Sequence, residues 1–247
     1  MIKDRNVLRV VTYNTHKSRG IDGRIRPERI AKVLKKLNAD IIALQEVWSY
    51  QEGPLRKDQA RFFSEELKLD CCIGETRKYR GGIYGNITLT RFPIDSTQTY
   101  DLSVGKRREK RGCLRTDIHV PELGKIHLFN LHLGTSYFER RHQARKLIDI
   151  SILKNPDLKG RRIVLGDFNE WTLGITTKLL REQFRSVDAT TIHPMKSFPG
   201  LIPVLPLDHI YFDPSFRLER LAIYRSPLAF VASDHLPVVA DFELKTA

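Results

Sequence analysis

Residues 163–169, Ile-Val-Leu-Gly-Asp-Phe-Asn, combine a short apolar run with two polar side chains. Consecutive apolar residues of this kind are typical of a strand that is buried on both faces. Asp167 and Asn169 come directly after the run, where the strand ends and a loop begins. Ligands of layered α/β folds bind at such positions, because rigid strands present loop residues there. The stretch therefore predicts a buried strand with candidate functional side chains at its end.

The same arrangement recurs along the chain, with polar residues placed just beyond, or just before, an apolar run. Each of them alone has an ordinary explanation, since a single Asp at a strand end is usually a turn former. Together they are drawn from only four residue types, which favours a shared function. The residues placed in this way are Asn14, Glu46, Asn130, His132, Asp167, Asn169, Asp208, Asp234 and His235.

Their composition has a chemical meaning. Carboxylate and amide oxygens suit a hard cation such as Mg²⁺ or Mn²⁺, and the lack of a Cys–His cluster disfavours zinc. Such a cation polarises a phosphoryl group, while a neighbouring carboxylate or histidine orients water. Motifs of serine hydrolases, zinc proteases and P-loop nucleotide hydrolases are absent from the sequence. The set therefore fits hydrolysis of phosphate esters better than acyl transfer.

Length and composition limit the class of protein. The chain has 247 residues, 41% of them hydrophobic and 29% charged, which is a globular balance that allows one domain over residues 1–247. The formal net charge of +13 attracts anions and polyanions. Only Cys71, Cys72 and Cys113 are present, so a disulfide scaffold is excluded and a reducing compartment is favoured. Without a signal-peptide pattern or a spanning apolar run, we expect a cytoplasmic protein.

Strand-like and helix-like segments alternate along the whole chain. The expected helices cover 27–37, 60–67, 141–153 and 172–184, the first because Ile30, Val33, Leu34 and Leu37 form one apolar stripe after Pro27. The expected strands cover 7–13, 41–44, 86–90, 163–165, 207–212, 218–223 and 238–242. A hairpin is expected from two further strands, 113–120 and 126–133. Mixed hairpins and crossovers favour a layered α/β sandwich over a doubly wound sheet.

Seven motifs carry a resemblance to a known family. In chain order they occupy residues 12–14, 44–47, 85–91, 130–133, 166–169, 207–210 and 233–237. In this order they resemble the endonuclease/exonuclease/phosphatase superfamily, which includes deoxyribonuclease I, exonuclease III, inositol polyphosphate 5-phosphatases and bacterial sphingomyelinases. The resemblance implies a four-layered α/β sandwich, in which two mixed sheets pack face to face with helices outside. The segments at residues 14–23 and 111–114 resemble those of small bacterial members of this superfamily whose substrates are not established.

The resemblance also implies roles for individual residues. Glu46 and Asn14 would bind the metal, with Asp234 near it. Asp167 would orient or deprotonate the attacking water, and His235, paired with Asp208, would contact the scissile phosphate as base or as protonated stabiliser. The remaining implied contacts to phosphate come from His132, Asn169, Asn130 and Arg111. The choice between Asp167 and His235 as base, and between one metal and two, stays open.

The substrate is less sharply defined. Asn130-Leu131-His132 differs from the Asn-x-Tyr motif of abasic-site endonucleases, and no long aromatic-tipped hairpin of the secreted sphingomyelinase kind is present. Basic runs at 77–80 and 106–111 suit a phosphate-rich partner. The first candidate is therefore a nucleic-acid phosphodiesterase. The alternatives are a phosphodiesterase or phosphomonoesterase acting on phospholipid-type esters, with anionic headgroups as partners, and a non-catalytic polyanion-binding module. No protein partner is predicted.

Overall fold

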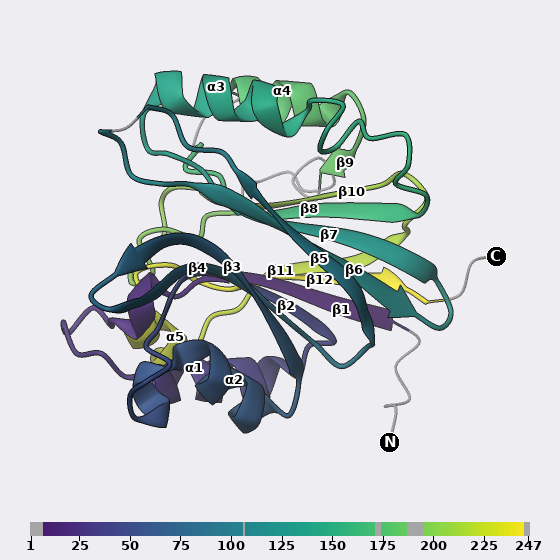
Figure 1. Cartoon of the computed structure of the whole chain (residues 1–247). Helices are drawn as coiled ribbons and strands as arrows, with labels where there is room; N and C mark the ends of the chain where they lie inside the picture. Colours follow the sequence, from purple (N-terminus) through teal and green to yellow (C-terminus); the bar gives the residue numbers. More distant parts are fainter. Residues whose placement is uncertain (1–6, 106, 171–173, 187–194, 245–247) are drawn as a thin grey trace.

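The computed structural model describes residues 7–105, 107–170, 174–186 and 195–244. Two six-stranded mixed sheets face each other (Figure 1). The first sheet has the order β11 (Leu218–Ile223), β12 (Val238–Glu243), β1 (Val7–Asn14), β2 (Ile41–Ser49), β4 (Gly82–Thr90) and β3 (Asp70–Tyr79). The second has the order β5 (Ile94–Asp101), β6 (Gly112–Val120), β7 (Gly124–His132), β8 (Arg161–Asp167), β10 (Asp208–Phe212) and β9 (Arg185–Ser186).

Helices form the two outer layers. Figure 1 shows one group of helices below the first sheet and the other above the second. The lower group is α1 (Pro27–Leu37), α2 (Gln59–Leu67) and α5 (Pro227–Ala232), and the upper group is α3 (Tyr137–Leu147) and α4 (Ile175–Arg181). Two short 3₁₀ turns, η1 (His16–Ser18) and η2 (Leu55–Lys57), follow β1 and β2. The expected four-layered α/β sandwich is confirmed.

Three apolar clusters fill the spaces between these layers. The middle cluster lies between the sheets and includes Val10, Ile41, Leu128 and Leu165. A second cluster packs the first sheet against α1, α2 and α5, and a third packs the second sheet against α3 and α4. Strands buried on both faces need continuous apolar runs, which explains the composition of β1, β2, β7 and β8. These four strands give the site a rigid base.

Helix α1 follows the predicted pattern closely. Pro27 occupies the first turn, where its missing N–H costs no hydrogen bond. The predicted stripe is buried on the face toward the first sheet. Asn38 then adopts a left-handed conformation, with φ of 48°, and its N–H donates to the carbonyl of Leu34. This cap ends the helix one residue after the stripe.

Other elements differ from the sequence-based prediction. Helix α3 begins at Tyr137 and ends at Leu147, whereas 141–153 was expected, because the buried Ile152 packs from the turns that follow the helix. Helix α4 is shorter than the expected 172–184, whose first two residues lie outside the described part of the chain. Strands β3, β5 and β9 and helix α5 were missed. The three missed strands lie at sheet edges, and none has a continuous buried run.

No helix in the described ranges has the length and apolar character needed to cross a membrane.

Candidate active site

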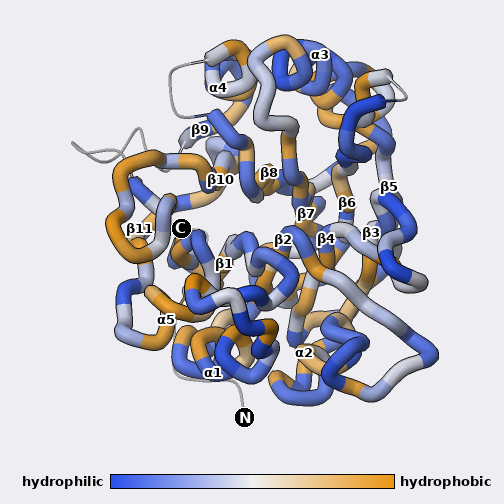
Figure 2. Tube along the Cα trace, turned by 90° about the vertical axis from the view of Figure 1, so that its left-hand side faces the viewer, coloured by the Kyte–Doolittle hydropathy of each residue, from blue (hydrophilic) through white to orange (hydrophobic). Residues whose placement is uncertain are grey.

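Strand pairing brings the predicted residues to one end of the two sheets. In the second sheet, β7 and β8 run parallel with His132 opposite Asp167, and β10 runs antiparallel to β8 with Asp208 also opposite Asp167. In the first sheet, β1 and β2 run parallel, and Asn14 lies opposite Gln45, the residue before Glu46. Figure 2 is viewed toward this end of the sheets. The functional side chains therefore meet between the sheets, at the position that the strand ends predict.

Gly166, the residue before Asp167, allows the close approach of β7 and β8 at this end. Its φ is +139°, and a Cβ at this position would lie 1.9 Å from the backbone oxygen of Leu131. Any side chain would push the two strands apart. The glycine of the Gly-Asp-Phe-Asn motif is therefore required by packing, in addition to any role in the site.

Asn14 joins the carboxylates of the two sheets. Its Nδ2 donates to Asp167 Oδ2 at 2.9 Å and to Glu46 Oε1 at 3.2 Å, while its Oδ1 accepts from the backbone N–H of His16. The Asn14 side chain is buried, as is that of Asp167. An amide is suited to this position, since its N–H₂ group can donate to two anionic oxygens at once.

Glu46 is held by its backbone and by a lysine. It has a φ of +55° at an irregularity in the pairing of β2 with β4, which re-aims its side chain. Its Oε2 lies 2.6 Å from Lys17 Nζ. Burial alone would raise the pKa of Glu46. At the low pH where Glu46 titrates, however, His132 is itself protonated, and its charge together with the Lys17 ammonium outweighs burial and holds the pKa well below its usual range. Glu46 is therefore an ionised carboxylate that already attracts a cation.

His235 and Asp208 form a buried pair. His235 Nδ1 lies 2.7 Å from Asp208 Oδ2, which also accepts a hydrogen bond from Ser197 Oγ at 2.5 Å. Burial would lower the pKa of His235, but the carboxylates of Asp208 and Asp167 outweigh it and raise the pKa to about 10. His235 is therefore an imidazolium at neutral pH, with its Nε2 3.7 Å from Asp167 Oδ2.

His132, in contrast to His235, is neutral. Its Nδ1 lies 3.2 Å from an Arg111 guanidinium nitrogen, which can only donate, so Nδ1 is the acceptor. The proton of the neutral ring then sits on Nε2, 3.5 Å from Asp167 Oδ2. Burial, supported by the positive charge of Arg111, lowers the pKa of His132 to about 4. Asp167 thus faces a neutral histidine and a protonated one.

Asn169 and Asp234, together with Arg111, border this group. Asn169, with a φ of 50°, donates from Nδ2 to the backbone oxygen of Leu133, and its N–H donates to Asp167 Oδ1. Asp234 is the more exposed of the two, and its Oδ1 lies 3.4 Å from His16 Nδ1. Arg111 extends to Glu109 at 2.9 Å through its second terminal nitrogen. All three lie around Asp167 and the two histidines, as the motif order implies.

Asn130 has a different environment from the other predicted residues. It is fully buried and joins the two sheets: its Nδ2 donates to the backbone oxygens of Leu44 and Ile87, and its Oδ1 accepts from Gln45 Nε2 at 2.8 Å. The whole amide is engaged in these contacts. We therefore assign Asn130 a positioning role, fixing β7 against β2 and β4 beneath the site.

The donor set fits a divalent cation. The carboxylates of Asp167 and Asp208 lie within 4.8 Å of each other, with the protonated ring of His235 equally close. Among the described residues, Asp208 Oδ1 is buried without a hydrogen-bond partner, and a buried carboxylate oxygen of this kind needs a positive group. At the first sheet, the Lys17 ammonium lies against Glu46, at the position where this carboxylate would bind a metal ion. Oxygen donors in such number are the ligands of hard cations.

Sequence reasoning did not assign a role to Ser197 or Phe198, and it did not predict the contact of Lys17 with Glu46. Lys17 lies in η1, where three successive residues have positive φ, and Gln59 fixes this turn by donating to the Lys17 carbonyl. Phe198 packs against His235, with ring centroids 4.9 Å apart and ring planes tilted by 48°. The amino-acid composition just after Asn14 does not predict a strained turn. Residues 197 and 198 are far from the other site residues in the sequence, and only the tertiary structure brings them close.

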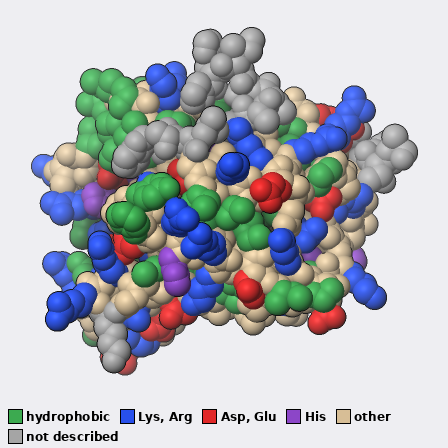
Figure 3. Space-filling model, turned by 90° about the horizontal axis from the view of Figure 1, so that it is seen from above, with side chains coloured by type: hydrophobic (Ala, Val, Ile, Leu, Met, Phe, Trp, Pro, Cys, Tyr) green, Lys and Arg blue, Asp and Glu red, His purple; other side chains and the backbone are tan. Residues whose placement is uncertain are grey.

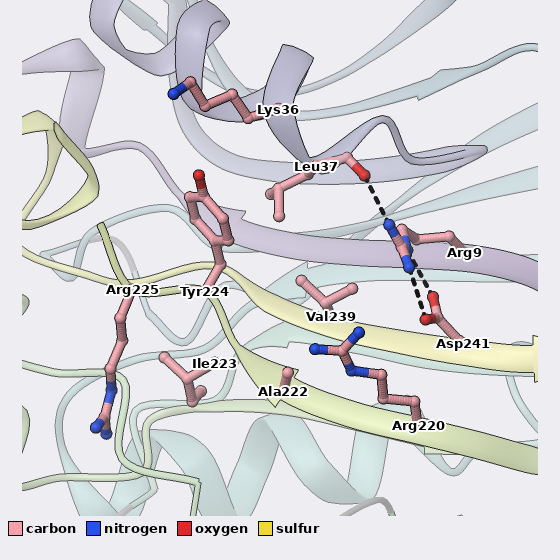
Figure 4. Close-up of a pocket in the computed structure, with 10 residues that line it drawn as sticks. All are labelled: Arg9, Lys36, Leu37, Arg220, Ala222, Ile223, Tyr224, Arg225, Val239 and Asp241. Atoms are coloured by element: carbon pink, nitrogen blue, oxygen red, sulfur yellow. Dashed lines mark hydrogen bonds and ion pairs between the residues drawn. The ribbon is translucent and has the colours of Figure 1, made fainter. Parts of the chain in front are cut away.

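A cavity of about 380 Å³ lies at the other end of β1 (Figure 4). It is lined by residues of α1, β11 and β12, and Arg9 in its wall is tied to Asp241 at 2.7 Å. Figure 4 shows Arg225 pointing away from the residues around Arg9. None of the predicted site residues lines this cavity. It is therefore separate from the candidate active site.

Comparisons with known proteins agree with this geometry. A model of the Endonuclease/Exonuclease/phosphatase family matches residues 11–235. A relative from Escherichia coli K12, the uncharacterized protein YbhP, is 31% identical over 249 residues, covering 96% of both chains. The crystal structure of an endonuclease/exonuclease/phosphatase from Bacteroides vulgatus has a TM-score of 0.78 at 18% identity, covering 98% of this chain and 100% of that one. A mannosyl-6-phosphatase from Bacteroides thetaiotaomicron has a TM-score of 0.75 at 20% identity, covering 95% and 99%.

The chain therefore belongs to the endonuclease/exonuclease/phosphatase family, a family of phosphoester hydrolases. The two solved structures share its fold at low identity, so they support the architecture alone.

Proposed function

We propose that this protein is a phosphodiesterase that depends on Mg²⁺ or Mn²⁺ and hydrolyses its substrate by direct attack of water on phosphorus. The observation that carries the proposal is the environment of Asp167, whose Oδ2 accepts from Asn14 and faces the Nε2 atoms of both His132 and His235. A carboxylate between a neutral donor and an imidazolium is suited to holding a water against a phosphate that is bound by the two rings.

The residues that would hold the cation are Glu46 and Asn14, with Asp234 near it. When bound, the cation would polarise the phosphoryl oxygens and offset the charge that develops on them. Glu46 is ionised and already faces Lys17, so the ammonium must move aside or share the carboxylate. The unpartnered oxygen of Asp208 supports a positive group near His235 as well.

The protein's own groups then divide the proton transfers between them. His235 is protonated at neutral pH because its pKa is raised to about 10, so it acts as a stabiliser of phosphate charge and not as a base. Asp167 takes the proton of the attacking water. Neutral His132 donates its Nε2 proton toward the phosphate or the leaving oxygen, and the side chain of Asn169 adds a donor. Arg111 provides a fixed positive charge behind His132.

Two substrate classes follow from different observations. The net charge of +13 and the basic residues near the site support a nucleic-acid phosphodiester, in which the backbone phosphates provide most of the contacts. A phospholipid diester is the second candidate, and one observation favours it: large apolar side chains are exposed on both sides of the site. The same hydrolytic chemistry serves both substrates.

A substrate panel with and without chelator tests this proposal. Plasmid DNA, RNA, anionic liposomes and bis(4-nitrophenyl) phosphate are each incubated with Mg²⁺ or Mn²⁺, and we expect cleavage of the chromogenic diester that chelator abolishes. Binding to a polynucleotide should weaken with salt at a log–log slope of about −0.9 for each duplex phosphate contacted. Cleavage that persists in chelator, or no cleavage of any phosphodiester, would contradict the proposed function.

A further inference from the structure

The exposed apolar residues of this protein are gathered around its active site. Of the nine large apolar side chains exposed in the described part of the chain, five lie in two short segments. We call them the apolar rim: Tyr137, Phe138, Leu201, Ile202 and Val204. Phe138 is 79% exposed and Ile202 is 69% exposed. Single exposed apolar residues are ordinary, whereas a group of large ones marks an interaction surface.

Both segments of the rim are anchored to the site. The backbone N–H of Gly200 donates to the carbonyl of Asp234, and the ring of Phe198 at the base of the same loop packs against His235. On the other side, Leu133 pairs through its backbone with Asp167 and Asn169, and the chain reaches Tyr137 four residues later. The rim therefore borders the site on two sides.

The figures agree with this placement. In Figure 2, which looks toward the site end of the sheets, an orange loop lies beside β10 and β11, and α3 lies at the top of the view. Figure 3 shows hydrophobic side chains gathered at the left-hand end of the molecule, with Lys and Arg side chains among them. The left-hand end is the end at which β1 finishes in Figure 1.

Positive charge accompanies the rim. Arg108 Nε lies 3.7 Å from Glu139 Oε1 in the first turn of α3, which places the basic loop beside Phe138. The side chains of Arg107, Arg108 and Lys110 are exposed, and Lys196 is exposed next to the other segment. A surface with apolar tips and flanking cations is complementary to an anionic lipid surface, where the tips enter the acyl boundary and the cations meet headgroup phosphates.

We infer that the apolar rim docks the active site onto an anionic phospholipid surface, so that a headgroup phosphodiester at that surface enters between the two segments. The inference rests on the proposed phosphodiesterase activity and specifies where its substrate lies. A nucleic-acid backbone would leave Leu201, Ile202 and Phe138 facing water, because its phosphates and sugars are hydrophilic. A lipid surface is the partner that uses both the apolar tips and the cations.

Vesicle binding with matched variants tests the docking surface. The full chain in chelator, which prevents turnover, is sedimented with vesicles of phosphatidylglycerol and phosphatidylcholine, or of phosphatidylcholine alone. The variants are Phe138→Ser with Ile202→Ser in the rim, and Ile150→Ser as control, since Ile150 is 67% exposed beyond the far end of α3. Exposed positions are chosen so that folding is unaffected, and hydrolysis of bis(4-nitrophenyl) phosphate is measured in parallel.

We expect the wild type and Ile150→Ser to bind the anionic vesicles, and the rim variant to bind them at least about tenfold more weakly, because each inserted side chain contributes through its buried apolar area. The rim variant should keep the activity on the soluble diester. Equal vesicle binding by the rim variant and the wild type, or no binding by the wild type, would overturn the inference. Failure of the proposed activity is seen separately, as absent hydrolysis of the soluble diester by every form.

Discussion

Replacement of Asp167 by asparagine is expected to lower kcat by about 10²–10⁴-fold, the range that a positioned acid or base contributes. The amide cannot accept the proton of the attacking water, yet it keeps the size of the carboxylate and its hydrogen bond from Asn14. The thermal midpoint should change much less than turnover, because loss of the charge relieves repulsion from Asp208 but also removes the attraction to the His235 imidazolium. Turnover on the soluble diester and a melting curve measure the two effects.

Asp117→Asn is the matched control. Asp117 is also a buried aspartate paired with a histidine, with its Oδ1 2.8 Å from His127 Nδ1, but it lies on β6 away from the site. Its replacement should lower stability and leave kcat unchanged. Near-normal turnover in Asp167→Asn, or an equal loss of turnover in Asp117→Asn, would contradict the assignment of Asp167.

Replacement of His235 by asparagine is the second large effect that we expect. Removing one fixed donor to the developing phosphate charge costs about 10²–10³-fold in kcat. The matched control is His127→Asn, which breaks the other buried Asp–His pair without touching the site. A comparable loss of turnover in both histidine variants would show a general effect of unfolding and not a role for His235.

The charge of His235 also gives a pH dependence with a definite sign. The pKa of His235 is raised in the folded state from its ordinary value of 6.5 to about 10, so the protonated form favours folding. This contribution to stability is complete below about pH 6.5 and is lost as the pH rises through about 10. Unfolding by urea across this range should therefore show stability falling with pH in the wild type, and a weaker fall in His235→Asn. An identical pH dependence in both proteins would exclude a protonated His235.

Much of the site was predictable because it lies where strands end. The polar residues after apolar runs could be read from the sequence, and the register of β7, β8 and β10 explains why Asp167, His132 and Asp208 meet. The chemistry of each residue was less predictable. His132 is neutral because of burial and the charge of Arg111, whereas His235 is protonated because of the carboxylates of Asp208 and Asp167. These groups are far apart in the sequence.

Two features had no signal in the sequence. Asn130 follows an apolar run like the other candidates, but its amide joins the sheets, because β7 packs directly against β2 and β4 at this point. The apolar rim lies in two short segments whose apolar residues resemble those of core-forming segments. Only their exposure, and the contacts of the neighbouring Phe198 with His235 and of Leu133 with Asp167, distinguish them.

The central claim is that the acidic and amide side chains at the strand ends form a site for a divalent cation. Titration of Mn²⁺ into the purified protein, followed by calorimetry and by the thermal midpoint, tests it most directly. The wild type and Asp117→Asn should bind the ion and be stabilised by it, as expected for a ligand of the native state, whereas Glu46→Gln should lose both signals and Lys17→Met should keep them. An unchanged titration in Glu46→Gln, or no binding by the wild type, would contradict the account.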